Sequence, residues 1–285
     1  MGDNKNSIST FYKIITSINN QSSISFTMNT GDMVFDGNPI KYDFFLKQLR
    51  LFKNPMIPVP GNHDEADGGI ERFISIFGPR YYSFSQGNAL FIVLDDSNEE
   101  NIDPWQLRWF KGELENSKNF KHTFVFMHVP VYDPRKKMEE QPGHSLKDPG
   151  SAREVLDLMK QYSIDMVFAG HIHGYFKGNW EGVPYTITGG GGAEMLYSDP
   201  EHYFYHYLQV NIDGDKVSYN TIKIHSPDFN FIDRIAAFIW IYLYSFIVIN
   251  YWILLLLVAL SVLLVAYIKQ YGKDFPFKIS RRKKK

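Results

Sequence analysis

The sequence has 285 residues and no cysteine, so disulfide bonds and thiolate chemistry are both excluded. It also lacks a marked excess of one charge, because its formal net charge is −1. The charge is unevenly spread, however: residues 1–234 contain 22 basic and 30 acidic side chains, a net charge of −8. An acidic surface repels phosphate backbones, so nucleic acid is not expected as a tightly held partner.

Formal charge is absent from residues 235–268, a stretch of 34 residues without Asp, Glu, Lys, Arg or His. A single membrane crossing needs about 20 residues. We expect an apolar centre over 253–268 and an aromatic-rich first part at the membrane interface, a position that tryptophan and tyrosine favour. The alternatives are a tight two-helix hairpin with short arms and a buried core helix.

A basic tail, residues 269–285, follows with eight Lys or Arg side chains and one acidic side chain. By the positive-inside rule, a single span would leave this tail in the cytoplasm and the preceding domain outside it. That orientation requires an export signal, and none is recognisable. If Met1 is the true start, a tail-anchored protein with a cytoplasmic domain is the better interpretation. The tail is also suited to contact anionic membrane lipid.

Hydrophobic patterning predicts an α/β domain over 1–228, an interfacial and transmembrane helix over 229–268, and the basic tail. Apolar residues at helical spacing predict helices over 8–20, 40–52, 104–116 and 152–161. Apolar runs predict strands over 25–30, 56–60, 89–94, 123–127, 165–169, 184–188, 204–212 and 216–224. This order indicates two sheets flanked by helices.

Four short polar motifs each follow a predicted strand, and ligands in open α/β sheets bind beyond the carboxyl ends of strands. The motifs supply aspartate, asparagine and histidine, the ligand types that hold divalent metals around phosphate oxygens. They are Gly31-Asp32 with Asp36-Gly37, Gly61-Asn62-His63-Asp64, Met127-His128, and Gly170-His171-Ile172-His173-Gly174. Each alone could be a polar turn, but the four in this order predict a metal centre.

These motifs resemble those of the calcineurin-like metallophosphoesterase superfamily, whose pattern is D-x-H, GDxxxDG, GNH[DE], a histidine after a strand, and GHxH. The resemblance covers about residues 1–225 and implies a four-layer αββα sandwich. The first motif departs from the pattern, because it reads Asp3-Asn4-Lys5 and a protonated lysine cannot ligate a metal. In this fold a buried strand precedes the first motif, so a further N-terminal segment is expected before Met1.

The resemblance also implies the metal ligands. Asp32 would bridge two divalent ions, and Asn62, His128 and His171 would complete one site. Asp3 and His173 would serve the other, which lacks its usual histidine and could bind weakly, recruit Asn4 or water, or stay empty. A frayed terminal residue is the alternative interpretation of Asp3.

The predicted catalytic residues are His63 and Asp64. The resemblance places His63 on the leaving-group side, as a proton donor or phosphate contact, whereas capping of the turn is an equal alternative for Asp64. Purple acid phosphatases carry an iron-binding tyrosine where this chain has Phe35, so a ferric site is not expected. Oxygen and nitrogen donors favour Mn²⁺, with Zn²⁺ and Fe²⁺ as alternatives.

The implied activity is hydrolysis of a phosphate ester at a membrane, by a hydroxide that bridges two metals and attacks phosphorus. The substrate would be a phosphorylated small molecule or a lipid-linked phosphate, as a monoester, diester or pyrophosphate. The alternative is a degenerate, non-catalytic phosphate-binding or scaffolding domain, since Lys5 could leave one metal or none. Phosphoprotein phosphatase activity has no extra signature, and the sequence does not indicate an oligomeric state.

Several other residues receive weaker assignments. The glycine run at 189–192 predicts a flexible turn, with backbone that approaches the phosphate pocket as the alternative. Asp95 and Asp96 are expected to cap a turn, and Arg135 to be a solvated loop charge. No ligand spacing supports His144, His202 or His206, and His122 is expected to be structural or exposed.

Overall fold

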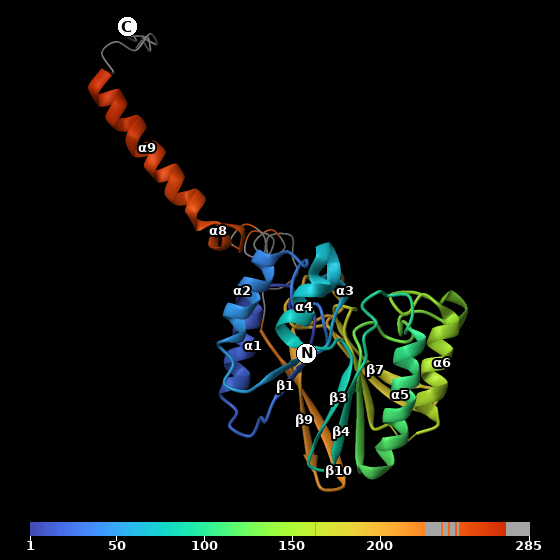
Figure 1. The fold of residues 1–285 in the computed structure, drawn as a ribbon. Helices are drawn as coiled ribbons and strands as arrows, with labels where there is room; N and C mark the ends of the chain where they lie inside the picture. The colour runs from blue at the N-terminus through green and yellow to red at the C-terminus, as the bar shows by residue number, and fades with distance from the viewer. Residues whose placement is uncertain (163, 226–234, 236–238, 240–242, 244, 272–285) are drawn as a thin grey trace. The chain divides into compact units, whose positions relative to one another are not determined.

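The computed structural model describes residues 1–162, 164–225, 235, 239, 243 and 245–271 (Figure 1). The chain divides into two units, residues 1–241 and residues 242–285, and each is described by itself. The predicted boundary at residue 228 and the basic tail beyond residue 271 lie outside the described residues.

The first unit contains a six-stranded sheet in the order β3-β4-β5-β6-β8-β7. Neighbours from β4 to β8 pair in parallel, while the edge strands β3 and β7 are antiparallel to their partners. The central strands are buried on both faces, as their continuous apolar runs predict. The strands are β3 Tyr82–Gln86, β4 Ala89–Val93, β5 His122–Phe126, β6 Met166–Ala169, β7 Tyr175–Trp180 and β8 Val183–Thr188.

Two smaller strand pairs face this sheet. Strand β1 Thr27–Asn29 is parallel to β2 Met56–Pro58, and β9 His206–Asp213 is antiparallel to β10 Lys216–Lys223. Alternate residues of the large sheet pack against residues of the small pairs and form one hydrophobic core. The core includes Ala89, Phe91, Val93, Phe124 and Phe126 from the large sheet, and Met28, Leu208, Ile212 and Val217 from the small pairs. This core joins the two sheet layers.

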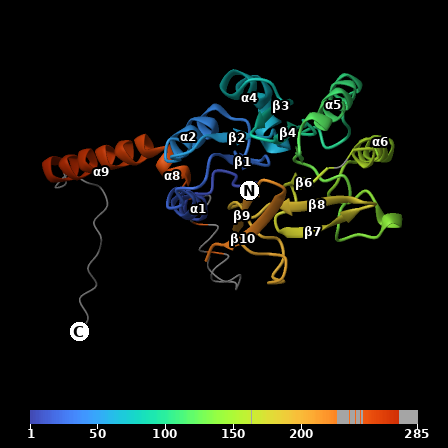
Figure 2. The same ribbon diagram turned by 90° about the horizontal axis from the view of Figure 1, so that it is seen from below.

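Helices cover both outer faces of the strand layers (Figures 1 and 2). On one side are α1 Ser9–Asn19, α2 Pro39–Leu49 and α4 Gly69–Phe77, whose apolar residues form one core with Tyr207 of β9. On the other side are α5 Pro104–Asn116 and α6 Pro149–Lys160, which pack on the opposite face of the large sheet through Leu107, Phe110, Val155 and Met159. Three cores between four layers confirm the expected αββα sandwich.

Of the two long helices on the large sheet, α5 begins at the predicted residue, and α6 begins three residues before the predicted position 152. Asp103 accepts hydrogen bonds from the backbone N–H groups of Trp105 and Gln106, and proline occupies the first turn of α5. Asp148 caps α6 in the same way, through the N–H of Gly150. These caps fix the helix starts against the sheet.

The first residues of the chain are packed against the end of β1. The backbone N–H groups of Asp3 and Lys5 donate to the carbonyls of Gly31 and Asp32 at 2.9 and 3.0 Å. Asp3 is fully buried, so the frayed-terminus interpretation of this residue is wrong. The strand expected ahead of it stays a prediction.

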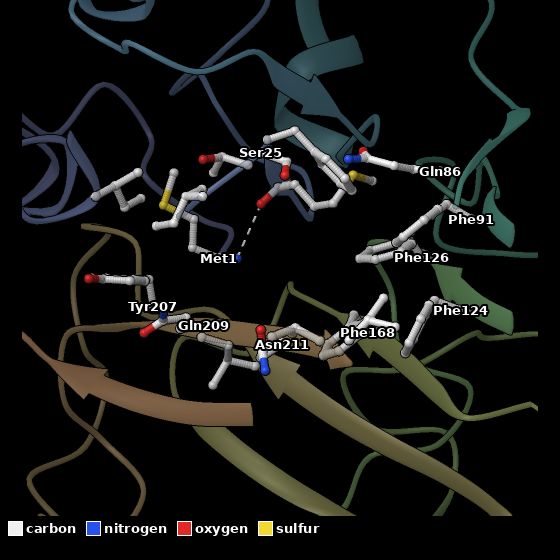
Figure 3. A pocket seen from close by; sticks show the side chains of 18 of the residues that line it. Met1, Ser25, Gln86, Phe91, Phe124, Phe126, Phe168, Tyr207, Gln209 and Asn211 are labelled. Carbon is white, nitrogen blue, oxygen red and sulfur yellow. Dashed lines mark hydrogen bonds between the residues drawn. The ribbon is translucent and has the colours of Figure 1, made fainter. Parts of the chain in front are cut away.

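A cavity of about 430 Å³ lies between the two sheet layers, beside β1 and β9 (Figure 3). Its wall on the large sheet is aromatic, with Phe91, Phe124, Phe126 and Phe168, and Met1 lies at its other side. Among the described residues, β1 pairs only with β2, and β9 pairs only with β10. The cavity lies between these two small strand pairs.

The second unit contains α8 Ser245–Ile249 and α9 Tyr251–Tyr271. Helix α9 has 21 residues and is long and apolar enough to cross a membrane, and none of its residues is buried. It contains the predicted apolar centre over 253–268.

Candidate metal centre

Four loops at the carboxyl ends of strands bring the predicted ligands together. Asp32 follows β1, and Asn62 opens the short helix α3 Asn62–Glu65 after β2. His128 follows β5, and His171 follows β6. Because the ends of parallel strands meet at one edge, residues separated by up to 139 positions in the chain converge at one place.

The four predicted ligands of the first site lie close together. Asn62 Oδ1 lies 3.0 Å from His128 Nε2 and 3.3 Å from His171 Nδ1. His128 Nε2 lies 3.3 Å from Asp32 Oδ1. Asp32 and His128 are almost wholly buried. An oxygen and nitrogen donor set of this kind suits a divalent transition metal.

The backbone is strained where it presents these side chains. Asp32 and His171 have φ angles of 55° and 65°, in the left-handed region that non-glycine residues avoid. Such a conformation costs on the order of 1–3 kcal/mol and is typical of functional sites. A side chain at Gly61 would overlap Asp32, so glycine is required where these two loops meet.

The histidines are held in forms that can donate a lone pair. Burial lowers the pKa of His128 and places the pKa of His171 well below its usual value, so both rings are neutral near pH 7. His128 Nδ1 lies 2.8 Å from the Thr30 carbonyl, so this nitrogen carries the proton and Nε2 faces Asp32 and Asn62. His173 Nδ1 is 2.7 Å from the Glu194 carbonyl, which directs Nε2 toward Asp3.

The negative charge of the buried carboxylates favours a bound cation. Burial alone would raise the pKa of Asp32, but the neighbouring His128 and Lys5 outweigh it and hold the pKa below its usual range. Among the residues that the structure describes, the buried Asp3 Oδ1 has no hydrogen-bond donor, and the buried Asp32 Oδ2 faces only the Lys5 ammonium, at 3.1 Å. A buried carboxylate oxygen without a donor is costly, so the residues present fit a bound cation.

The second predicted site is only partly formed, because Lys5 reaches into it. Lys5 Nζ lies 3.1 Å from Asp32 Oδ2, and the lysine side chain is 14% exposed. Asp3 Oδ1 and His173 Nε2 are 3.6 Å apart beside it. The structure therefore places Asp3 and His173 together as predicted, with an ammonium where the resemblance expects a histidine.

His63 lies at the half-buried edge of the centre. Its backbone N–H donates to Asp32 Oδ1 at 3.0 Å, and its ring Nδ1 lies 2.6 Å from the Phe35 carbonyl. This carbonyl accepts a hydrogen bond from Nδ1, so the ring is oriented by backbone rather than by Asp64. No sequence signal identifies this carbonyl, since any residue at position 35 would supply it.

Asp64 supports the loops. Its carboxylate accepts hydrogen bonds from the backbone N–H groups of Met33, Val34 and Gly61 at 2.8, 3.1 and 2.9 Å. It thereby connects the Gly31-Asp32 loop to the Gly61-Asn62 turn. These contacts favour the capping role, and the catalytic role of Asp64 stays a prediction.

Replacement of Asp64 by alanine is expected to lower the free energy of unfolding by about 3 kcal/mol or more, because three buried N–H groups lose their acceptor. Asp64→Asn keeps one acceptor oxygen and is expected to cost less. Denaturant unfolding followed by circular dichroism measures both variants. An Asp64→Asn protein with unchanged stability but no hydrolytic activity would instead support a role in the chemistry.

Three supporting features were not identified from the sequence. Asp96 accepts from the backbone N–H groups of His128 and Val129 at 2.9 and 2.8 Å, so it positions the metal-facing histidine. The His144 ring lies 5.7 Å from that of His171, on the exposed side of the centre. Arg135 forms a two-pronged ion pair with Asp133, at 2.8 Å for each contact, rather than a solvated charge.

The glycine run at 189–192 is not a flexible turn. It is buried, and the N–H of Gly191 donates to the Gly2 carbonyl at 2.8 Å. Ala193 continues the contact by donating to the Asp3 carbonyl at 2.7 Å. Backbone without side chains is needed here because the run lies directly against the segment that carries Asp3 and Lys5.

The fold and the donor set define the first unit as a metallophosphoesterase domain. A family model described as calcineurin-like phosphoesterase matches residues 1–175. The chain therefore belongs to the calcineurin-like phosphoesterase family.

Two curated proteins are among the relatives that this chain resembles in sequence. The chain is 26% identical to the serine/threonine-protein phosphatase CPPED1 of Rattus norvegicus over 153 residues, which cover 50% of this chain and 48% of that protein. It is 24% identical to a probable cyclic nucleotide phosphodiesterase of Rhodopseudomonas palustris over 234 residues, which cover 75% of this chain and 83% of that protein. The chain thus spans about half the length of the CPPED1 relatives that it matches.

Solved structures share the fold. Purple acid phosphatase PPD1 from yellow lupin seeds aligns with a TM-score of 0.62 and 16% identity, over 77% of this chain and 50% of that one. A dimetal phosphatase from Danio rerio aligns with a TM-score of 0.58 and 14% identity, over 74% of this chain and 85% of that one. At these identities the likeness shows the fold alone.

Proposed function

We propose that the domain hydrolyses a phosphate ester with the help of a divalent metal held by Asp32, Asn62, His128 and His171. The observation that carries the proposal is the convergence of these four donors on one place, beside the buried Asp3 Oδ1, which lacks a hydrogen-bond donor. A bound metal would lower the pKa of a coordinated water and neutralise charge on the phosphoryl oxygens.

The chain's own residues supply orientation and proton transfer. His63 Nδ1 is hydrogen-bonded to the Phe35 carbonyl, so Nε2 is the ring atom that would face a leaving group or a phosphoryl oxygen. Asp96 and the Thr30 carbonyl accept hydrogen bonds from His128 and fix its position. Asp64 accepts hydrogen bonds from both the Gly31-Asp32 loop and the Gly61-Asn62 turn and fixes them relative to each other. The site is therefore preorganised before substrate binds.

The number and kind of metal are part of the proposal. The resemblance gives two ions, with Asp3, Asp32 and His173 as donors to the second. Mn²⁺ is the first choice for this oxygen and nitrogen donor set, with Zn²⁺ or Fe²⁺ as alternatives. The substrate would be a phosphorylated small molecule or a lipid-linked phosphate, since the relatives are named for both monoester and diester hydrolysis.

The test uses the full chain in detergent, stripped of metal with a chelator and then supplied with Mn²⁺, Zn²⁺ or Fe²⁺. Hydrolysis of p-nitrophenyl phosphate and bis-p-nitrophenyl phosphate is measured before and after metal is returned. We expect negligible turnover without metal and recovery with Mn²⁺. A folded protein that binds phosphate but shows no metal-dependent turnover would support the non-catalytic alternative, which the Lys5–Asp32 ion pair favours.

Membrane attachment is the second part of the proposal. Helix α9 would span the bilayer, and the basic tail would face the cytoplasm with the phosphoesterase domain on the other side. A cytoplasmic domain on a tail anchor is the alternative. Protease protection in sealed membrane vesicles separates the two, because only one side of the chain is then accessible.

A further inference from the structure

We infer that the Lys5 ammonium takes the place of one of the two metal ions, so that the centre binds a single divalent cation with Lys5 as its second positive charge. The inference rests on the proposed metal centre and specifies how many ions it holds. It does not depend on which substrate is hydrolysed.

The position of Lys5 is fixed by the backbone around it. Its N–H donates to the Asp32 carbonyl at 3.0 Å, and that of Asn6 donates to the Met33 carbonyl at 3.1 Å. The buried Asn4 side chain also donates to the Met33 carbonyl, at 2.8 Å. Lys5 itself has a φ of 39°, in the left-handed region. These hydrogen bonds hold the segment in place and keep the Lys5 side chain next to Asp32.

The two oxygens of Asp32 serve different partners. Oδ1 faces His128 Nε2 at 3.3 Å and accepts the His63 N–H at 3.0 Å, on the side of the complete donor set. Oδ2 faces Lys5 Nζ at 3.1 Å. A carboxylate that bridged two metals would give its second oxygen to the second ion, and in this chain an ammonium stands at that oxygen.

Too few donors remain for a second ion. Asp3 Oδ1 and His173 Nε2 point toward the Lys5 side of the centre, but Asp3 Oδ2 is already engaged by the His171 N–H at 3.1 Å. A protonated lysine offers three donors and no lone pair. Transition metals in proteins are held by about three or four protein ligands. Because Lys5 stands at Asp32 Oδ2, only Asp3 and His173 are left as donors in this half of the centre.

Charge balance leads to the same conclusion. The predicted ligands of the centre include two buried carboxylates, Asp3 and Asp32. One divalent cation and one ammonium already outweigh these two negative charges. A second divalent cation within a few ångströms of Lys5 would be repelled in a site with little water to screen the charges. The ammonium is instead free to meet a phosphoryl oxygen, which lysine binds as a point charge.

Metal content of the full-length protein, purified in detergent without chelator and equilibrated with Mn²⁺, tests the inference. Elemental analysis is expected to give about one ion per chain for the wild type and about two for Lys5→His, which restores the missing ligand. Lys5→Arg keeps the charge and Lys5→Met removes it without adding a ligand, so both are expected to stay near one ion. Electron paramagnetic resonance of bound Mn²⁺ should show an isolated ion in the wild type and a coupled pair in Lys5→His.

Two ions in the wild type, or one ion in a folded Lys5→His protein, would overturn the inference and leave the proposed metal centre intact. No ion in any variant would overturn the metal centre itself. Lys5→Met is further expected to lower hydrolysis roughly a hundredfold while it keeps its ion, as loss of one charge-stabilising donor does elsewhere. Unchanged hydrolysis in Lys5→Met would show that the ammonium only fills the space of a metal.

Discussion

Replacement of His171 by alanine is expected to remove the bound metal and to lower phosphoester hydrolysis by about a thousandfold or more. His171 Nδ1 is 3.3 Å from Asn62 Oδ1 and follows β6, so it is one of the four donors of the proposed site. The three remaining donors would hold a divalent cation weakly. Alanine at position 171 would keep most of the strain of the φ angle of 65°. The substitution should therefore lower the affinity for metal rather than change the stability of the fold.

The measurement combines elemental analysis with thermal unfolding in the presence and absence of Mn²⁺. The wild type should be stabilised by the metal, and His171→Ala should not, because only a bound ion shifts the unfolding equilibrium. His225→Ala is the matched control, since this histidine is exposed and lies outside the centre. A His171→Ala protein that keeps both its metal and its activity would exclude the assigned site.

The ligand set could be predicted from sequence because its motifs resemble those of a known family, and because Asp32, Asn62, His128 and His171 each follow a strand. The apolar runs before Asp32, His128 and His171 fix where the strands end, and parallel strand ends meet at one edge of the fold. The contacts between loops could not be predicted in the same way. That Lys5 reaches Asp32 Oδ2, or that Asp96 holds the backbone of His128, depends on the packing of segments far apart in sequence.

The elements missed from sequence were missed for separate physical reasons. Strands β3 and β7 lie at the edges of the large sheet, where polar residues such as those of Ser83–Ser85 and Lys177 are tolerated and no apolar run forms. Helix α4 is short and begins at a glycine rather than at a side-chain cap. The glycine run at 189–192 has the composition of a turn, and only its fit against residues 2–4 explains its burial.

Replacement of His63 by alanine is expected to lower kcat by about a hundredfold to ten-thousandfold while the metal stays bound. His63 touches Asp32 only through its backbone N–H, which alanine keeps, so the carboxylate remains in place. The ring is lost, and with it the group oriented by the Phe35 carbonyl toward the leaving-group side. Steady-state kinetics and elemental analysis on the same preparation separate loss of chemistry from loss of metal.

The choice of substrate then decides what His63 does. If it donates a proton to the leaving group, the loss should be large for an alkyl phosphate and small for a p-nitrophenyl ester, whose leaving group needs little protonation. If it only contacts the phosphate, both substrates should lose activity equally. His144→Ala provides the comparison, because this histidine lies on the exposed side of the centre and should change both rates less. A His63→Ala protein with wild-type rates on both substrates would place the proton donor elsewhere.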